Sequence, residues 1–344
     1  MEEIMNIATF GIDVGKTWFH LIGLDSRGAV VARERFSRSQ LLRYMSRIEP
    51  ALVGMEASCG SHHLARDLIA LGHDARLMSA KFVRPFLKGN KNDYLDAEAI
   101  AEAVQRPTMR FVPVKTPEQL DLQAIHRIRS GLVSRRTGVI NQIRSFLQDR
   151  GITVPPGPAV LARRLPEILA DIEGRLMPGI KRLLTLLQQQ WLTINAQVAE
   201  LEAELRDVAE RDDACKRIAS IPGIGAITAT AIVAAIGDGR MFRSGRDFAA
   251  WLGLVPRQYS TGGRSTLLGI SKRGNSYIRT LLIHGSRCML RFFKNPATAI
   301  GMWVTQLKAR THANVAAVAL ANKQARTAWA LLTQGTFYET RPMT

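Results

Sequence analysis

The sequence predicts an α/β domain with a mixed sheet, followed by a mainly helical region. Over the first third of the chain, short apolar strand patterns alternate with helical patterns, which is typical of an α/β layer structure. Further on, apolar residues recur at alternating gaps of three and four, as in a coiled coil. Helical patterns then continue to about residue 332.

The first segment, residues 4 to about 36, is predicted to be a β-meander. One strand runs through Asp13, the next ends at Leu24, and a third follows the turn at 25–28. Asp13 is predicted to sit in the middle of its strand, where a charge among apolar residues needs compensation.

The stretch FGIDVGKT at residues 10–17 ends in Gly-Lys-Thr, as a Walker A loop does. A Walker A loop places four residues between its glycines, whereas Gly11 and Gly15 are separated by three. The spacing and the carboxylate inside it exclude this kind of phosphate cradle. The question becomes what Asp13 does.

The remaining elements follow in order. The α/β part continues with a helix, a strand that ends at Glu56, a second helix, another strand and a loop that leads into a helix: 40–48, 51–56, 62–70, 74–79 and 88–105. A long helix is predicted at 116–150, before a Pro/Gly break at 154–158. The heptad positions are Leu184, Leu187, Trp191, Ile194, Val198, Leu201, Leu205 and Val208. We read Trp191 as a core residue of this seam.

These patterns divide the chain into four parts: an α/β domain (4–112), a basic helical segment (113–153), a coiled-coil arm (160–212) and a C-terminal domain (213–335). The 344 residues carry 47 Lys and Arg against 29 Asp and Glu, a net charge of +18, which favours a nucleic-acid partner. No apolar run is long enough to span a membrane, and the three cysteines form no CxxC pair. We expect a cytoplasmic, reduced protein without a membrane partner.

Four carboxylates stand out in the α/β part. Asp13 and Glu56 lie on neighbouring predicted strands, and Asp93 and Asp96 share one face at the start of a helix. This constellation resembles the acidic site of the ribonuclease-H-like fold, in which two Mg²⁺ or Mn²⁺ ions promote phosphoryl transfer. The alternatives are solvated surface acids, with Asp93 capping its helix, or an actin-like ATPase. The latter needs a second Gly-rich phosphate loop, which the sequence lacks.

Basic and glycine-rich features follow in the helical region. The helix at 116–150 carries arginines that could contact a nucleic-acid backbone or form a solvated cationic face: Arg127, Arg129, Arg135, Arg136 and Arg144. The IPGIG segment, with Gly223 and Gly225, resembles a helix-hairpin-helix turn that grips phosphate, or else a packing turn. Residues 259–275 are predicted to be a flexible loop in which Ser260 stands among Arg264, Lys272 and Arg273. Such a loop could bind a phosphate or present a nucleophile to one.

Taken together, the motifs resemble the DEDD-type insertion-sequence transposases of bacteria, the IS110 family that includes the Piv invertases. The matching stretches lie in the family's order between about residues 7 and 332: GIDVGK, GMEASCG, KNDYLDAEAIAEA, IPGIGAITATAI, FAAWLGLVPRQYSTGGRSTLLGISKRGNSYIRTLLIHGSR and NVAAVALANKQARTAWALL. Each motif alone is weak, but six in register are specific.

The resemblance implies a RuvC-like domain whose DEDD quartet is Asp13, Glu56, Asp93 and Asp96, with a Mg²⁺ or Mn²⁺ cofactor. It implies a catalytic serine, which maps to Ser260, although Thr261 follows where many relatives have a second serine. It also implies donor and target DNA, a structured noncoding guide RNA, a dimeric or tetrameric assembly and a place at the bacterial nucleoid. Two other functions stay open: a RuvC-like nuclease or junction resolvase without a covalent intermediate, and a non-catalytic nucleic-acid-binding protein.

Overall fold

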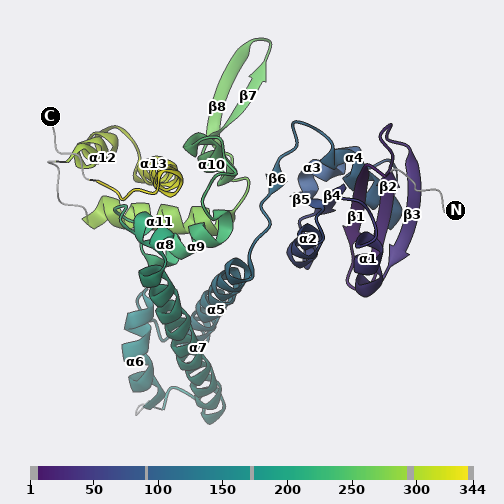
Figure 1. Cartoon of the computed structure of the whole chain (residues 1–344). Helices are drawn as coiled ribbons and strands as arrows, with labels where there is room; N and C mark the ends of the chain where they lie inside the picture. Colours follow the sequence, from purple (N-terminus) through teal and green to yellow (C-terminus); the bar gives the residue numbers. More distant parts are fainter. Residues whose placement is uncertain (1–6, 90–91, 171–173, 293–297, 340–344) are drawn as a thin grey trace. The chain divides into compact units, whose positions relative to one another are not determined.

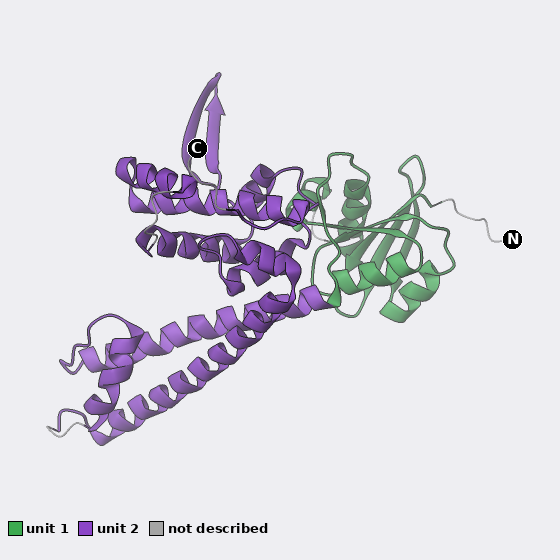
Figure 2. Cartoon of the chain, turned by 60° about the vertical axis from the view of Figure 1, so that its left-hand side comes forward, with its two compact units in different colours: residues 1–117 green, residues 118–344 purple. Residues whose placement is uncertain are grey.

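The computed structural model describes residues 7–89, 92–170, 174–292 and 298–339. The chain forms two compact units, Met1–Pro117 and Glu118–Thr344 (Figure 2). Within the described residues, no helix combines the length and the apolar character needed to cross a membrane.

The first unit is built on a six-stranded mixed sheet in the order β3-β2-β1-β4-β5-β6 (Figure 1). Its strands are β1 (Thr9–Val14), β2 (Phe19–Leu24), β3 (Val30–Phe36), β4 (Leu52–Glu56), β5 (Asp74–Met78) and β6 (Phe111–Val112). Strands β1, β2 and β3 are antiparallel neighbours, which confirms the predicted meander. Strands β1, β4 and β5 run parallel, as strands joined by helical crossovers do.

Helices cover both faces of this sheet. They are α1 (Arg38–Met45), α2 (Ser61–Ala70), α3 (Ala80–Val83), the 3-10 turn η1 (Arg84–Phe86) and α4 (Asp93–Val104). Because strand side chains alternate, Phe10 and Ile12 of β1 enter the core formed with α1 and α2. The residues between and after them, Gly11 and Asp13, therefore face α4.

The described part of the second unit is mainly helical and contains one two-stranded hairpin. Two long helices, α5 (Pro117–Gln148) and α7 (Pro178–Arg211), pack with α6 (Pro158–Ala170) around a core of their own. Of the heptad residues, Leu184, Trp191, Ile194, Val198 and Leu205 are buried. The burial of Trp191 fits its predicted role as a core residue.

A second helical core lies in the C-terminal part of this unit. It is formed mainly by α8 (Asp213–Ala219), α9 (Ala226–Ile236), α10 (Gly245–Trp251), α11 (Ser276–Phe292) and α13 (Ala313–Gln334), while α12 (Ala299–Arg310) packs in a small cluster with α11 and α13. A hairpin of β7 (Pro256–Thr261) and β8 (Arg264–Ile270) emerges between α10 and α11 (Figure 1). Residues 256–269 are all exposed, so the hairpin belongs to neither core.

Candidate functional site

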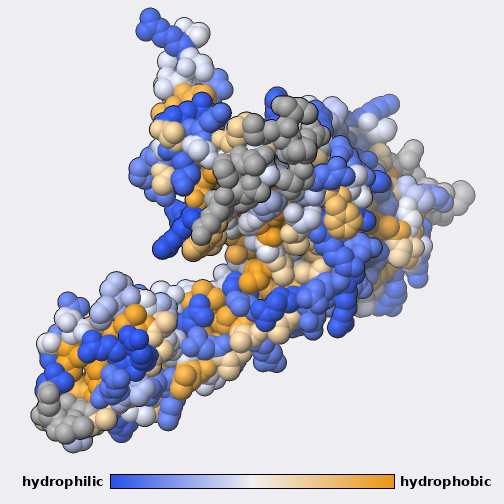
Figure 3. Space-filling model, turned by 90° about the vertical axis from the view of Figure 1, so that its left-hand side faces the viewer, coloured by the Kyte–Doolittle hydropathy of each residue, from blue (hydrophilic) through white to orange (hydrophobic). Residues whose placement is uncertain are grey.

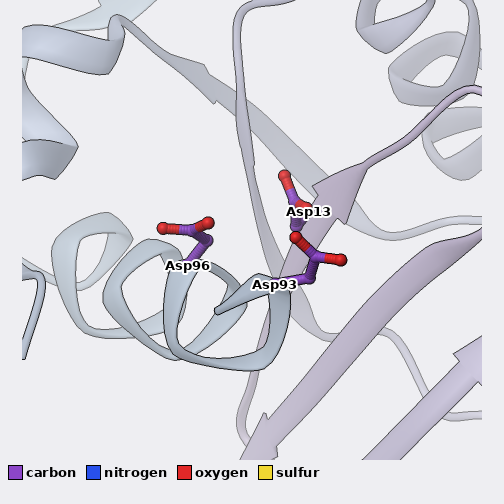
Figure 4. Close-up of side chains that lie close together, drawn as sticks. All are labelled: Asp13, Asp93 and Asp96. Carbon is purple, nitrogen blue, oxygen red and sulfur yellow. The ribbon is translucent and has the colours of Figure 1, made fainter. Parts of the chain in front are cut away.

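Three carboxylates gather at one edge of the sheet. Asp13, Asp93 and Asp96 each offer an oxygen atom, and these oxygens lie within 4.8 Å of one another (Figure 4). Asp13 is the fifth of the six residues of β1, so it lies near the carboxyl end of the strand. The prediction that it lies in the middle of the strand was wrong. Asp93 and Asp96 occupy the first turn of α4. Residues 80 positions apart in the chain thus form one acidic cluster.

The cluster exists because α4 lies almost directly on the backbone of β1. A Cβ atom added to Gly11 would stand 2.1 Å from the carbonyl oxygen of Ala97 and 2.5 Å from the backbone nitrogen of Ala101. Side chains two apart in a strand share a face, so Asp13 emerges on the same face as Gly11, beside the start of α4. The absence of a side chain at Gly11 therefore brings the strand and helix carboxylates together.

Glu56 joins the same edge from the neighbouring strand. The parallel register pairs Ile12 with Met55, which places Glu56 next to Asp13 at the ends of β4 and β1. Its oxygens lie outside the group of mutually close atoms, but burial and then the charges of Asp13 and Asp96 raise the pKa of the Glu56 carboxyl. The structure thus brings all four predicted acids to one edge of the sheet.

Asp93 does not cap α4, which was the alternative interpretation of this residue. The N-cap of α4 is Asn92, whose side-chain oxygen accepts a hydrogen bond from the backbone N–H of Tyr94 at 2.9 Å. Two acids in the first turn also interact favourably with the positive end of the helix dipole. The start of α4 therefore holds Asp93 and Asp96 on a helix that is capped by another residue.

His20 is a neighbour of the cluster that the sequence analysis did not single out. It lies directly opposite Asp13 in the antiparallel register of β1 and β2, and its Nδ1 is 3.7 Å from Oδ2 of Asp93. The alternation of β2 together with the short connection from β1 could have predicted this pairing. The imidazole is the polar group of β2 that faces the acidic edge.

Ser260 lies on β7, and the predicted loop at 259–275 is mainly a β-hairpin instead. The two-residue turn is Gly262-Gly263, where both residues have positive φ, as a tight hairpin turn of this kind requires. The Gly-Gly pair between hydroxyl-rich runs was the signal for this turn. Ser260 pairs with Ser265 across the hairpin, and the side-chain amide of Gln258 donates a hydrogen bond to its Oγ at 2.9 Å.

The hairpin separates the two candidate hydroxyl groups. Thr261 pairs with Arg264, one step along the strand from the pair of Ser260 and Ser265. Because successive side chains alternate, Ser260 and Thr261 point to opposite faces of the hairpin. A phosphate that approaches one face can therefore meet only one of them.

The predicted basic residues divide into exposed and internally engaged groups. Arg127 and Arg135 on α5 are exposed, as are Arg264, Lys272 and Arg273 near the hairpin. Arg129 donates to Glu202 of α7 at 2.9 Å, Arg136 to Asn195 at 3.4 Å, and Arg144 to the carbonyl of Pro155 at 2.9 Å. The last three side chains therefore link α5 to its neighbours within the unit.

The IPGIG segment forms a tight turn that packs on other helices. Gly223 has a positive φ, and a Cβ there would lie 2.5 Å from Nε2 of Gln324. That amide is buried and donates to the carbonyl of Pro222 at 2.7 Å. Gly225 is exposed and is the N-cap of α9, which has no side-chain cap. Packing accounts for Gly223, while Gly225 lies exposed at the N-terminus of α9.

An α/β sheet with an acidic edge, joined to a helical region, fits a DEDD nuclease-like domain in a DNA-cutting enzyme. A family model for DEDD-type IS110 proteins, described as Transposase, matches residues 10–151. A second model, described as Transposase IS116/IS110/IS902 family, matches residues 215–299.

Relatives match the chain over almost its whole length. It is 44% identical to the transposase for insertion sequence element IS1328 of Yersinia enterocolitica, over 97% of this chain and 99% of the relative. A probable family 20 transposase of Pseudomonas aeruginosa has the same identity and coverage. The transposase for IS1111A of Coxiella burnetii is 43% identical over 98% of this chain and 93% of the relative. The chain therefore belongs to the IS110 family of insertion-sequence transposases.

The acidic cluster fits the divalent-metal use that a DEDD transposase domain indicates. Three carboxylates with oxygens this close repel one another, and the pKa of Glu56 is raised first by burial and then by the charges of Asp13 and Asp96. A cation among them relieves that repulsion. The donor atoms are all carboxylate oxygens, the ligands that hard divalent cations prefer.

Proposed function

We propose that this transposase cuts and rejoins DNA with a divalent-metal site on Asp13, Glu56, Asp93 and Asp96 and with Ser260 as the nucleophile. The observation that carries the metal half is the group of three carboxylates with oxygens within 4.8 Å of one another. The observation that supports the serine half is that Ser260 is exposed on its hairpin strand, where a DNA strand can reach its hydroxyl.

The metal half rests on the chemistry of the donor atoms. Four carboxylates at one edge of a sheet suit Mg²⁺ or Mn²⁺, which bind hard oxygen ligands. When bound, such ions stabilise negative charge on the oxygens of a reacting phosphodiester. The contribution of the chain itself is to hold Asp13 on a buried sheet and Asp93 and Asp96 on a helix packed against it, so that little reorganisation is needed.

In the proposed serine step, Oγ of Ser260 attacks the phosphorus of the DNA strand. A bond forms between Oγ and phosphorus while the bond from phosphorus to one strand oxygen breaks. The serine hydroxyl loses its proton to solvent, and the released strand oxygen takes up a proton from solvent to become a free hydroxyl end. The strand is then held on the protein as a phosphoserine ester, and attack by another strand end reverses the step and releases the serine. Gln258 already donates a hydrogen bond to Oγ, the atom that gains and loses charge.

The proposed partners are donor DNA, target DNA and a structured noncoding guide RNA. The net charge of +18 supports a polyanionic partner. Within the proposed basic segment (113–153), Arg127 and Arg135 are the exposed candidates for RNA phosphates, because Arg129, Arg136 and Arg144 have partners inside the unit. Near the hairpin, Arg264, Lys272 and Arg273 are exposed candidates for DNA phosphates. The backbone at Gly225 is a further candidate for contact with a nucleic-acid phosphate.

We also propose that the arm (160–212) joins copies of the chain into a dimer or tetramer. Apolar side chains remain exposed along α7: Leu183, Leu186 and Leu192, with exposed fractions of 43%, 50% and 59%. Figure 3 shows apolar patches among hydrophilic surface on the face that it views. Exposed apolar residues gathered on one element are typical of a protein–protein contact.

A second candidate function is metal-dependent hydrolysis of DNA without a covalent intermediate. The observation that favours it is that all four carboxylates lie at one edge of the first unit, so a metal site for hydrolysis needs nothing from the hairpin. In that case Ser260 serves only to contact DNA.

The two functions differ in what the Ser260→Ala variant does. Wild type and variant are incubated with labelled donor DNA, co-purified RNA and Mg²⁺, and are then denatured. With Ser260 as nucleophile, wild type retains label covalently and the variant retains none. As a mere hydrogen-bonding group, Ser260 contributes roughly 0.5–1.5 kcal/mol, so cleavage would slow about tenfold at most.

Thr261→Ala is the matched control, because Thr261 is the next residue of the same strand but points to the opposite face. We expect Thr261→Ala to form the adduct as wild type does. An adduct that persists in Ser260→Ala and vanishes in Thr261→Ala would assign the reaction to the other hydroxyl. Cleavage by both variants within about tenfold of the wild-type rate, with no adduct on any of the three proteins, would establish the hydrolytic function.

A further inference from the structure

The carboxylates of the acidic cluster differ in how firmly the chain holds them. Asp13 belongs to a strand in the middle of the sheet, and Asp96 is half-buried. Asp93 is the first residue of α4, and its side chain is 56% exposed. An exposed carboxylate samples several rotamers, so a site that uses Asp93 needs a neighbour that restricts them.

His20 is placed to be that neighbour. Its side chain is only 14% exposed, and its Nδ1 lies 3.7 Å from Oδ2 of Asp93. The cross-strand register also sets it directly opposite Asp13. Among the described residues, the ligand atoms that lie mutually within 4.8 Å belong to the three aspartates, and His20 stands outside that group. The imidazole therefore lies beside the cluster, and its nitrogen next to Asp93 belongs to a softer donor type than the carboxylate oxygens that Mg²⁺ and Mn²⁺ prefer.

A stack of side chains fixes the His20 ring. The imidazole meets the ring of Tyr94 edge-on, with centroids 4.9 Å apart and planes at 74°. The guanidinium of Arg33 lies over the same Tyr94 ring, 5.0 Å from its centroid. Tyr94 directly follows Asp93, so β2 and β3 hold the first turn of α4 through this stack. The position of Asp93 is thus coupled to the sheet by contacts with two side chains on neighbouring strands.

We propose that His20 is a positioning residue that orients Asp93 for a divalent cation. This inference rests on the proposed metal site. Carboxylates that bind metals are themselves oriented by neighbouring hydrogen-bonding groups, and loss of such a neighbour typically weakens metal binding about 10–100-fold. His20 provides a ring nitrogen 3.7 Å from Oδ2 of Asp93 and a ring that packs edge-on against Tyr94. Both contacts come from one side chain on the strand next to Asp13.

The test is Mn²⁺ binding to the full-length protein without nucleic acid, measured by calorimetry and by the paramagnetic resonance signal of free Mn²⁺. His20→Phe keeps the ring contact with Tyr94 and removes the nitrogen. We expect its Mn²⁺ affinity to fall about tenfold or more. His63→Phe is the matched control, because His63 also pairs with a carboxylate, Asp67 at 2.9 Å, in the same unit. Its affinity should match that of wild type.

His20→Asn tests the role of the nitrogen separately from the fold. Its amide reaches a similar place, so we expect it to recover most of the affinity that His20→Phe loses, with unchanged thermal unfolding of the metal-free protein. Affinity of His20→Phe equal to wild type would overturn the proposal, as would a His20→Asn variant as weak as His20→Phe. If wild type itself binds no Mn²⁺ while Asp13→Asn behaves identically, the proposed metal site fails, and this inference fails with it.

Discussion

The acidic edge and the serine hairpin are built in contrasting ways. The carboxylates stand on a central strand and on a helix that meets it at backbone distance, with apolar cores on both faces of the sheet. The hairpin consists of two strands, is exposed along residues 256–269 and takes no part in either core of its unit. A two-stranded hairpin alone is marginally stable in water.

The difference matches what each region is proposed to do. Metal ligands need a fixed spacing, because four negative charges must be held together before the cation arrives. A nucleophile that must reach a phosphate and then release it gains from standing on an exposed element. Substitutions at the acidic edge should therefore affect both chemistry and folding, whereas substitutions in the hairpin should affect chemistry alone.

The largest effect is expected for Asp13→Asn. It removes one proposed metal ligand and one charge, so DNA strand cleavage in Mg²⁺ should fall about a thousandfold or more. DNA binding should change less than about twofold, because the net charge is dominated by 47 basic residues. Cleavage rates and filter-binding affinities measured on the same preparation check both halves. Cleavage at the wild-type rate would remove Asp13 from the metal site.

Acid should weaken both compact units, because each contains a histidine whose pKa is lowered mainly by burial. Burial and then Arg129 lower the pKa of His126 to about 4, and burial and then Lys115 and Arg66 lower that of His62 to about 4. The unfolded chain binds these protons near the ordinary histidine pKa of 6.5, whereas the folded chain does not. Stability is therefore full above about pH 6.5 and is lost as the pH falls towards about 4.

The loss attributable to His126 is about 3 kcal/mol at most, and solvent screening makes that of His62 smaller. The ring nitrogens of His126 form hydrogen bonds with the hydroxyl groups of Tyr277 at 3.0 Å and Thr230 at 3.1 Å. The histidine therefore links α5 to α11 and α9. Urea unfolding at a series of pH values measures the effect. The variant His126→Gln should be less stable at neutral pH and show a flatter pH dependence. An equally steep dependence in this variant would assign the acid sensitivity to other groups.

Two glycine substitutions compare the regions directly. The methyl group of Gly11→Ala collides with the backbone of α4, so this change should lower the free energy of unfolding of the first unit by roughly 1–3 kcal/mol. In Gly262→Ala the methyl group meets open space, and the cost is limited to strain at a positive φ. Thermal unfolding should register the first change and not the second. Equal shifts would show that the hairpin is part of the cooperative unit.

The smallest effect is expected for single arginines on α5. Arg127→Gln removes an exposed cation, so the slope of log affinity for RNA against log salt should become shallower by about one. Arg129→Gln removes a cation that already pairs with Glu202, so its slope should stay near that of wild type while stability falls. A reversed pattern would place the RNA on the Arg129 side of the helix.

Much of the acidic edge could be predicted from the sequence, because it follows from local rules. Strand alternation and parallel pairing bring Asp13 and Glu56 to neighbouring strand ends, and helical periodicity sets Asp93 and Asp96 on one face. His20 was not singled out because its place beside Asp93 follows only when the register of β1 and β2 is combined with the position of α4, which no single motif displays. The close approach of α4 to β1 at Gly11 could not be predicted either, because it depends on which helix covers which face of the sheet.

The helical unit was harder to predict in detail. The long helix α5 was expected. The hydrogen-bond partners of Arg129 and Arg144 come from α7 and from the segment after α5, so sequence alone could not tell which arginines bond within the unit and which are exposed. At residues 259–275, abundant glycine and serine suggested a loop, whereas cross-strand pairing gives a hairpin. In both places the deciding contacts join residues that are distant in sequence or in register.

The opposite orientation of Ser260 and Thr261 has a consequence for how the hairpin can change length. Side chains of a strand alternate between two faces, so inserting or deleting one residue between the base of the hairpin and Ser260 turns that hydroxyl to the other side. A change of two residues restores its direction and moves it by about 7 Å along the strand. Inserting or deleting an even number of residues therefore changes how far Ser260 stands from the base of the hairpin. An odd number also reverses the face on which its hydroxyl lies.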